Sequence, residues 1–102
     1  MSDIASLHAS LVARVLQAEG RASRETRSAA FDNKGLPDPI GRFVDKVAHS
    51  ASLVTDADIG TLRNAGLSED QIYEIVVCAA IGQATRQYQN ALAALSAATG
   101  RD

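Results

Sequence analysis

The sequence is poor in the residues that carry redox and metal chemistry. Its 102 residues include one cysteine, two histidines, two phenylalanines, two tyrosines and no tryptophan. A single cysteine excludes an intrachain disulfide and a CxxC redox pair, and with two histidines we expect no His/Cys metal site within one chain. The residue inventory therefore predicts neither a bound metal nor a cofactor.

The chain also lacks an excess of charge and a long apolar run. Ten Lys and Arg residues stand against twelve Asp and Glu, a net charge of −2, which gives no sign of bulk affinity for nucleic acid. The longest apolar run, Ile75–Ile81, is far shorter than the ~20 residues of a membrane span. Met1–Ile4 shows no basic segment leading into an apolar one. We expect no nucleic-acid partner, no membrane and a cytoplasmic location.

What the sequence has in quantity is small aliphatic side chains. Hydrophobic residues make up 46% of the chain, and nineteen residues are alanine. A core of small and aliphatic groups favours closely packed helices over a β-sandwich. The length is that of one domain. The composition therefore predicts a single all-α domain over residues 1–102.

Hydrophobic spacing and capping residues predict about five helices. Ser23, Thr55 and Ser68 are predicted N-caps, and Asp38 is a predicted cap before Pro39 at the first helical position. Gly66 is predicted to end the fourth helix in a left-handed conformation. The predicted helices cover residues 3–19, 24–31, 39–53, 56–65 and 69–98.

The first and the last of these helices carry long apolar stripes. The last one would extend roughly 45 Å, at ~1.5 Å per residue, unless Gly82 interrupts it. That length overhangs a domain whose radius of gyration would be about 13 Å, so we expect a second chain to cover it. The stripes consist of Ile4, Leu7, Leu11, Val15 and Ala18 in the first helix, and of Ile72, Ile75, Val76, Ala79, Ala80, Leu92 and Leu95 in the last.

The stretch from Ile40 to Leu95 resembles the C-terminal part of the alkylhydroperoxidase D-like, or carboxymuconolactone decarboxylase, superfamily. The resemblance rests on "VTDADIGTLRNAGLSEDQI" followed by an Ala-rich helix that carries Arg86. It implies a helical bundle with a long C-terminal helix and an oligomeric habit. Family peroxidases carry a CxxC pair and a nearby His upstream, but Met1–Pro39 contains no Cys and only His8. No catalytic residue is therefore carried over.

Cys78 is the only thiol and a candidate redox residue. It stands in an apolar run with no basic residue within a helical turn, and Glu74 precedes it by four positions. A reactive thiolate needs a nearby cation or a helix N-terminus. The surroundings favour a buried small side chain over a peroxidatic thiol.

Four polar residues are candidates for a ligand site. Arg86 interrupts a small, apolar helix and could bind an anion or close an interhelical ion pair. Tyr73 and Tyr88 are the available hydroxyl donors, with Tyr73 better placed to face solvent or a groove. His49 follows Asp45 by four residues, so the two share a helical face as a potential general base or a plain ion pair.

Two further patterns favour structural roles. Arg14, Arg21, Arg24 and Arg27 form a basic cluster that we interpret as a solvated face. The segment Asp56–Val77 has the outline of a helix-turn-helix, but its second helix would present carboxylates to DNA phosphates.

These features predict a small helical protein without the CxxC pair, acting as a non-catalytic oligomerising module. Its partner would be a second copy of the chain or a related full-length protein. The alternative is an enzyme with an intersubunit site, either a cofactor-free decarboxylase or isomerase or a single-Cys peroxidase.

Overall fold

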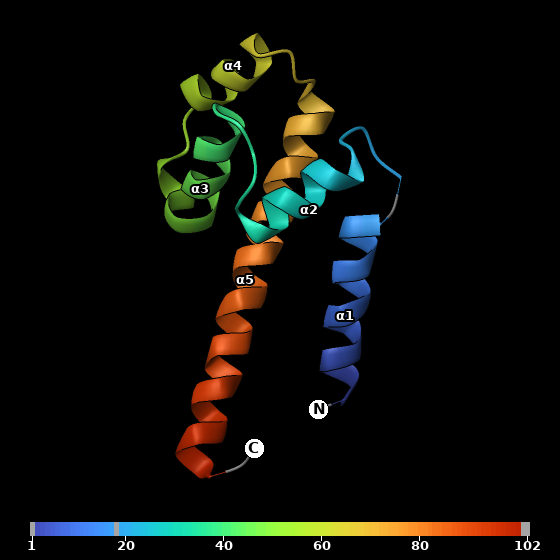
Figure 1. Ribbon diagram of the computed structural model, residues 1–102, viewed down its shortest axis with the longest axis vertical. Helices are drawn as coiled ribbons and strands as arrows, with labels where there is room; N and C mark the ends of the chain where they lie inside the picture. The colour runs from blue at the N-terminus through green and yellow to red at the C-terminus, as the bar shows by residue number, and fades with distance from the viewer. Residues whose placement is uncertain (1, 18, 101–102) are drawn as a thin grey trace.

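The computed structural model describes residues 2–17 and 19–100, and the side chains of residues 5–17 and 19–100. Within these ranges the chain forms helices and no strand (Figure 1). The predicted all-α class with a long C-terminal helix is confirmed. The elements are α1 (Ser2–Gln17), α2 (Arg24–Asp32), α3 (Ile40–Ser50), the 3-10 turn η1 (Ala51–Leu53), α4 (Asp56–Asn64) and α5 (Glu69–Thr99).

Side-chain caps fix where three of the helices begin, as predicted. The Ser23 hydroxyl accepts a hydrogen bond from a backbone N–H in the first turn of α2. Thr55 with Asp58, and Ser68 with Gln71, form reciprocal capping boxes at the starts of α4 and α5. Each box satisfies N–H groups that have no partner within the helix.

Helix α3 is shorter than the sequence predicts at both ends. It begins at Ile40, one residue after Pro39, although Asp38 still caps the first turn by accepting the Arg42 N–H at 3.2 Å. It ends at Ser50, where φ changes to −148° and the chain enters η1. The tighter turn redirects the backbone toward the extended Thr55 cap of α4, and the apolar spacing alone does not encode that change of direction.

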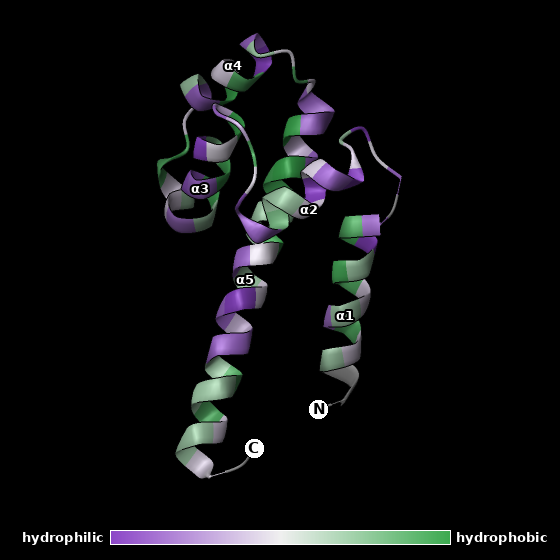
Figure 2. Cartoon of the chain, in the orientation of Figure 1, coloured by the Kyte–Doolittle hydropathy of each residue, from purple (hydrophilic) through white to green (hydrophobic). Residues whose placement is uncertain are grey.

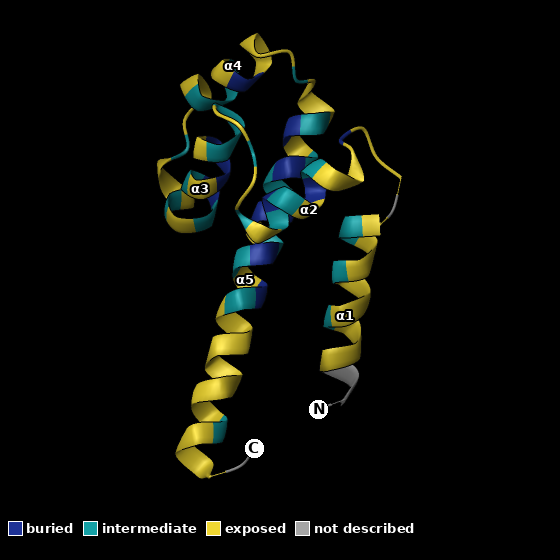
Figure 3. Cartoon of the chain, viewed as in Figure 1, coloured by how far each residue is buried: buried dark blue, intermediate teal, exposed yellow. Residues whose placement is uncertain are grey.

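The core lies where α2, α3 and α4 pack on the first half of α5. Its largest fully buried side chains are Leu62, Ile75, Val44 and Cys78. Figure 3 shows that buried residues gather in this part of the molecule, whereas α1 and the second half of α5 are largely exposed. We call residues 22–86 the head.

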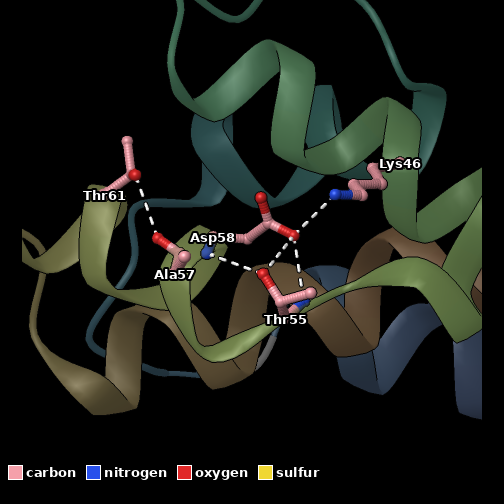
Figure 4. Close-up of polar contacts among 5 residues, drawn as sticks. All are labelled: Lys46, Thr55, Ala57, Asp58 and Thr61. Atoms are coloured by element: carbon pink, nitrogen blue, oxygen red, sulfur yellow. Dashed lines mark hydrogen bonds and ion pairs between the residues drawn. The ribbon is translucent and has the colours of Figure 1, made fainter.

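A polar link joins α3 to α4 across the head surface. Lys46 Nζ lies 2.7 Å from Asp58 Oδ2, and the same oxygen accepts the Thr55 N–H at 2.9 Å (Figure 4). The Lys46 hydrogen bond, followed by the bond from Thr55, lowers the pKa of Asp58. One carboxylate thus caps α4 and holds α3 beside it.

Two helical segments project from the head, and we call them the prongs: α1 and residues 87–99 of α5. They make the molecule long, with extents of 51 × 28 × 21 Å and a radius of gyration of 15.3 Å, against about 13 Å for a compact chain of this length. The predicted apolar stripe of α1 is largely exposed in the single chain, with Leu7 at 71% and Leu11 at 45%. Ile4 and Ala18 lie outside the described side chains.

Gly82 does not interrupt α5, which runs unbroken from Glu69 to Thr99. The residue is buried instead where α2 ends against α5, and a Cβ at this position would overlap the carbonyl group of Phe31. The absence of a side chain therefore permits the close approach of the two helices.

Candidate functional site: a cavity beside Arg27

A cavity of about 240 Å³ opens between the end of α1, the connection that follows it, and the facing sides of α2 and α5. Its lining combines apolar groups with two arginines and two glutamates. The residues are Arg14, Val15, Glu19, Gly20, Arg27, Tyr73, Glu74, Val77 and Cys78. All of the cavity therefore belongs to one chain.

Arg27 is the buried cation of this cavity. It lies on the inner face of α2 with 5% of its surface exposed. Its Nη1 donates to the Val15 carbonyl at 3.1 Å, one of the last four carbonyls of α1 that no helical N–H reaches. Its buried Nε has no hydrogen-bond partner among the described residues. Arg27 therefore caps α1 and keeps unused donor capacity.

Glu74, on α5, fastens the connection between α1 and α2. Its two carboxylate oxygens accept the backbone N–H groups of Arg21 and Ala22, each at 2.9 Å. Burial raises the pKa of Glu74, but these two hydrogen bonds and the nearby Arg27 and Arg21 charges outweigh it, so the net shift is downward. Glu74 is therefore ionised at neutral pH and committed to the backbone.

Cys78 forms part of the cavity wall one turn along α5 from Glu74. Its side chain is buried, and Sγ lies 3.9 Å from the Val15 carbonyl oxygen. Burial raises the pKa of this thiol to about 11, with Arg27 opposing and Glu74 adding to the shift. The thiol is protonated at neutral pH, whereas nucleophilic chemistry needs the thiolate.

Arg86 has a different environment from the one expected of an ion pair or an anion site. Its Nη1 donates to the Phe31 carbonyl at 2.6 Å and its Nη2 to Gln83 Oε1 at 3.0 Å. Phe31 is in the last turn of α2, so Arg86 supplies a donor and a positive charge at a helix C-terminus. No carboxylate among the described residues pairs with it.

The other predicted site residues lie apart from one another. Tyr73 is 70% exposed at the cavity, whereas Tyr88 lies beyond the head with its ring centroid 5.5 Å from that of His8. His49 pairs with Asp45 at 3.2 Å, and both side chains are exposed. No contact within the described ranges joins His49 to Arg86 or Tyr88.

The interpretation of the basic cluster as a solvated face is wrong for one of its four members. Arg14, Arg21 and Arg24 are exposed, but Arg27 is buried. The available signal was its spacing of three residues before Ala30, which places both on one face of α2. Sequence reasoning also assigned no contact to His8, whose Nε2 lies 3.1 Å from the Thr85 hydroxyl.

Comparisons with known proteins add no relative: no family model, curated protein or solved structure matches the chain. The resemblance to the alkylhydroperoxidase D-like superfamily stays a prediction. The described side chains include no group of three or more His, Cys, Asp or Glu residues arranged to hold a metal ion. In the same ranges, no helix combines the length and apolar character needed to cross a membrane.

Proposed function

We propose that this chain is a small helical protein of the alkylhydroperoxidase D-like kind that acts as a self-associating module, with its prongs forming the interface. The observation that carries the proposal is the α5 prong. Residues 87–99 form three and a half turns of helix beyond the head, and every side chain in them is exposed except the partly buried Ser96.

An unsupported helix of this length is marginal in water, because helical stability in proteins comes mostly from packing an apolar face. Leu92 and Leu95 remain 45% and 59% exposed, and they continue the face on which Thr85 and Tyr88 meet His8. Figure 2 shows hydrophobic residues along α1 and over the last turns of α5. A partner that covers these leucines would stabilise the helical conformation of this segment.

The charge pattern of the prongs favours a second copy as that partner. Residues 87–100 contain no Asp, Glu, Lys or Arg, and neither do residues 4–13 of α1. In a two-fold interface each patch meets an identical patch, so a charge near the axis would face itself. These two stretches avoid this repulsion, and their alanines allow helix backbones to approach closely.

Light scattering coupled to size-exclusion chromatography tests the proposal. We expect a species of at least twice the 10.7 kDa chain mass at micromolar concentration. The double variant Leu92→Glu/Leu95→Glu should elute as a monomer, because it places like charges across the interface. Leu53→Glu is the matched control: Leu53 is 63% exposed but lies in η1 of the head, so its replacement should leave the oligomer intact.

An unmodified chain that stays monomeric at micromolar concentration would contradict the proposal. So would an oligomer that survives the double substitution in the α5 prong. Circular dichroism of each variant separates loss of association from loss of the fold. The redox alternative gains no support from Cys78, whose burial keeps the thiol protonated.

A further inference from the structure

The buried guanidinium of Arg27 is incompletely satisfied. An arginine side chain carries five N–H donors and no acceptor. Among the described residues one of these donors has an acceptor, the Val15 carbonyl, and the buried Nε has none. A buried cation is costly unless a counter-charge and hydrogen-bond acceptors accompany it.

Glu74 does not supply that counter-charge by direct contact. Its carboxylate influences Arg27 through space, as the lowered Glu74 pKa reflects, and each of its oxygens accepts one backbone N–H, from Arg21 or Ala22. No ion pair joins Arg27 to a carboxylate within the described ranges. The described part of the chain therefore supplies no acceptor for the remaining N–H groups of the Arg27 guanidinium.

The size and lining of the cavity limit which ligand could accept hydrogen bonds from Arg27. At about 240 Å³ it is smaller than the ~300 Å³ lower end of common small-molecule sites, which favours a small ligand. Val15 and Val77 line it with aliphatic surface, and the exposed Tyr73 lies at its edge. The charges of the lining balance, with Arg14 and Arg27 against Glu19 and Glu74. The aliphatic part of the wall suits a short hydrocarbon body, and the guanidinium suits a planar, two-oxygen anion.

We infer that the cavity beside Arg27 binds a small organic acid, with its carboxylate on the Arg27 guanidinium and its short apolar body between Val15 and Val77. The ligand would also join α1 to the head, because the same arginine caps α1 and both helices contribute to the walls. This inference does not depend on self-association, since every lining residue belongs to one chain.

A nuclear magnetic resonance titration of the full chain with butyrate, and in parallel with butyramide, tests the inference. The two probes have the same shape and differ in charge. We expect butyrate to shift the amide signals of the cavity residues in a saturable manner, above all Val15, Gly20, Val77 and Cys78. Butyramide should bind at least about tenfold more weakly, because it cannot neutralise the buried cation.

Arg27→Gln should weaken butyrate binding by at least about tenfold, since it removes the charged fork. Arg24→Gln is the matched control, because Arg24 is an exposed arginine on the same helix and its loss should leave binding unchanged. If Arg27→Gln does not fold, the comparison of butyrate with butyramide on the unaltered chain still decides the question. Equal shifts with the two probes, shifts scattered over the surface, or undiminished binding by folded Arg27→Gln would each overturn the inference.

Discussion

The head and the prongs are built from the same kind of helix, yet they differ in what holds them. In the head, three helices bury their apolar faces on the first half of α5, and Leu62, Val44 and Ala79 are fully covered. In the prongs, leucines at equivalent helical spacing remain exposed, and the polar link from His8 to Thr85 joins α1 to α5. An apolar stripe thus indicates that a face needs a partner without indicating which chain supplies it.

Side chains satisfy helix ends both within the head and where the head meets α1. Within the head, side chains complete both ends of α2: Ser23 accepts at its start, and Arg86 donates to the Phe31 carbonyl near its end. At the junction with α1, Arg27 donates to the Val15 carbonyl near the end of that helix. Because these arginines reach from a neighbouring helix, each cap is also a tertiary contact.

The largest contrast is expected between a head leucine and a prong leucine. Leu62→Ala should lower the free energy of unfolding by about 2–5 kcal/mol, because Leu62 is fully buried and its truncation leaves a cavity. Leu95→Ala should change it by less than about 0.5 kcal/mol in the monomer, because Leu95 is 59% exposed. Urea denaturation followed by circular dichroism, at a concentration too low for association, gives both values. Similar losses for the two variants would remove the distinction between head and prongs.

Gly82 gives the second contrast, and here the sign of the effect is decisive. Helix propensity alone predicts that Gly82→Ala stabilises α5 by about 1 kcal/mol. The overlap of a Cβ with the Phe31 carbonyl predicts the opposite, a loss of about 1–3 kcal/mol as α2 is displaced. The midpoint temperature of thermal unfolding, compared with that of the unaltered chain, shows whether Gly82→Ala stabilises or destabilises the fold.

Gly60→Ala is the matched control for this substitution. Gly60 also lies inside a helix of the head, but a Cβ there meets no atom within 4 Å. We expect this variant to gain up to about 1 kcal/mol from helix propensity. A stabilised Gly82→Ala would mean that α2 does not pack closely on α5.

How far the sequence predicted this architecture depends on the range of the interaction. Ser23, Thr55 and Ser68 mark helix starts because a cap acts within three residues, and all three are confirmed. The burial of Arg27 depends on contacts with distant segments, such as its hydrogen bond to the Val15 carbonyl of α1. The local sequence pattern does not encode those contacts.

Prediction of the candidate site was limited in the same way. The sequence indicated Arg86 as a residue that binds an anion or closes an ion pair, whereas in the structure Arg86 donates to a backbone carbonyl. Arg27 was grouped with exposed arginines because its neighbours along the chain are charged. Its cavity is assembled from α1, α2 and α5, and the register between these helices is what puts Val15 beside Cys78.

Glu74 predicts a pH dependence at the junction between prong and head. Its pKa is lowered in the folded state, so the unfolded chain binds its proton first as the pH falls. The stabilisation is therefore complete above the ordinary glutamate pKa and is lost as the pH drops through the folded value. Glu74→Gln should cost about 1–2 kcal/mol at neutral pH, because the Gln amide oxygen replaces only one of two acceptors.

The difference between Glu74→Gln and the unaltered chain should shrink toward zero below the folded pKa of Glu74. Asp58 and Asp45 also have lowered pKa values, Asp45 chiefly through the Asn33 hydrogen bond, but both are present in each protein and cancel in the difference. Chemical denaturation at a series of pH values measures it. Parallel stability curves would show that the Glu74 carboxylate does not hold the connection after α1.

The smallest expected effect concerns how α1 rests on α5. His8→Ala removes the contact with Thr85 and the ring contact with Tyr88, together worth about 1 kcal/mol. Because His8 lies outside the core, the loss should appear as faster amide hydrogen exchange along α1, by about fivefold at 1 kcal/mol, with exchange in the head unchanged. Ser10→Ala is the control, since Ser10 is exposed on the same helix and alanine favours helix. If His8→Ala accelerated exchange in α2 and α3 equally, α1 would be a cooperative part of the head and the boundary between the two regions would have to move.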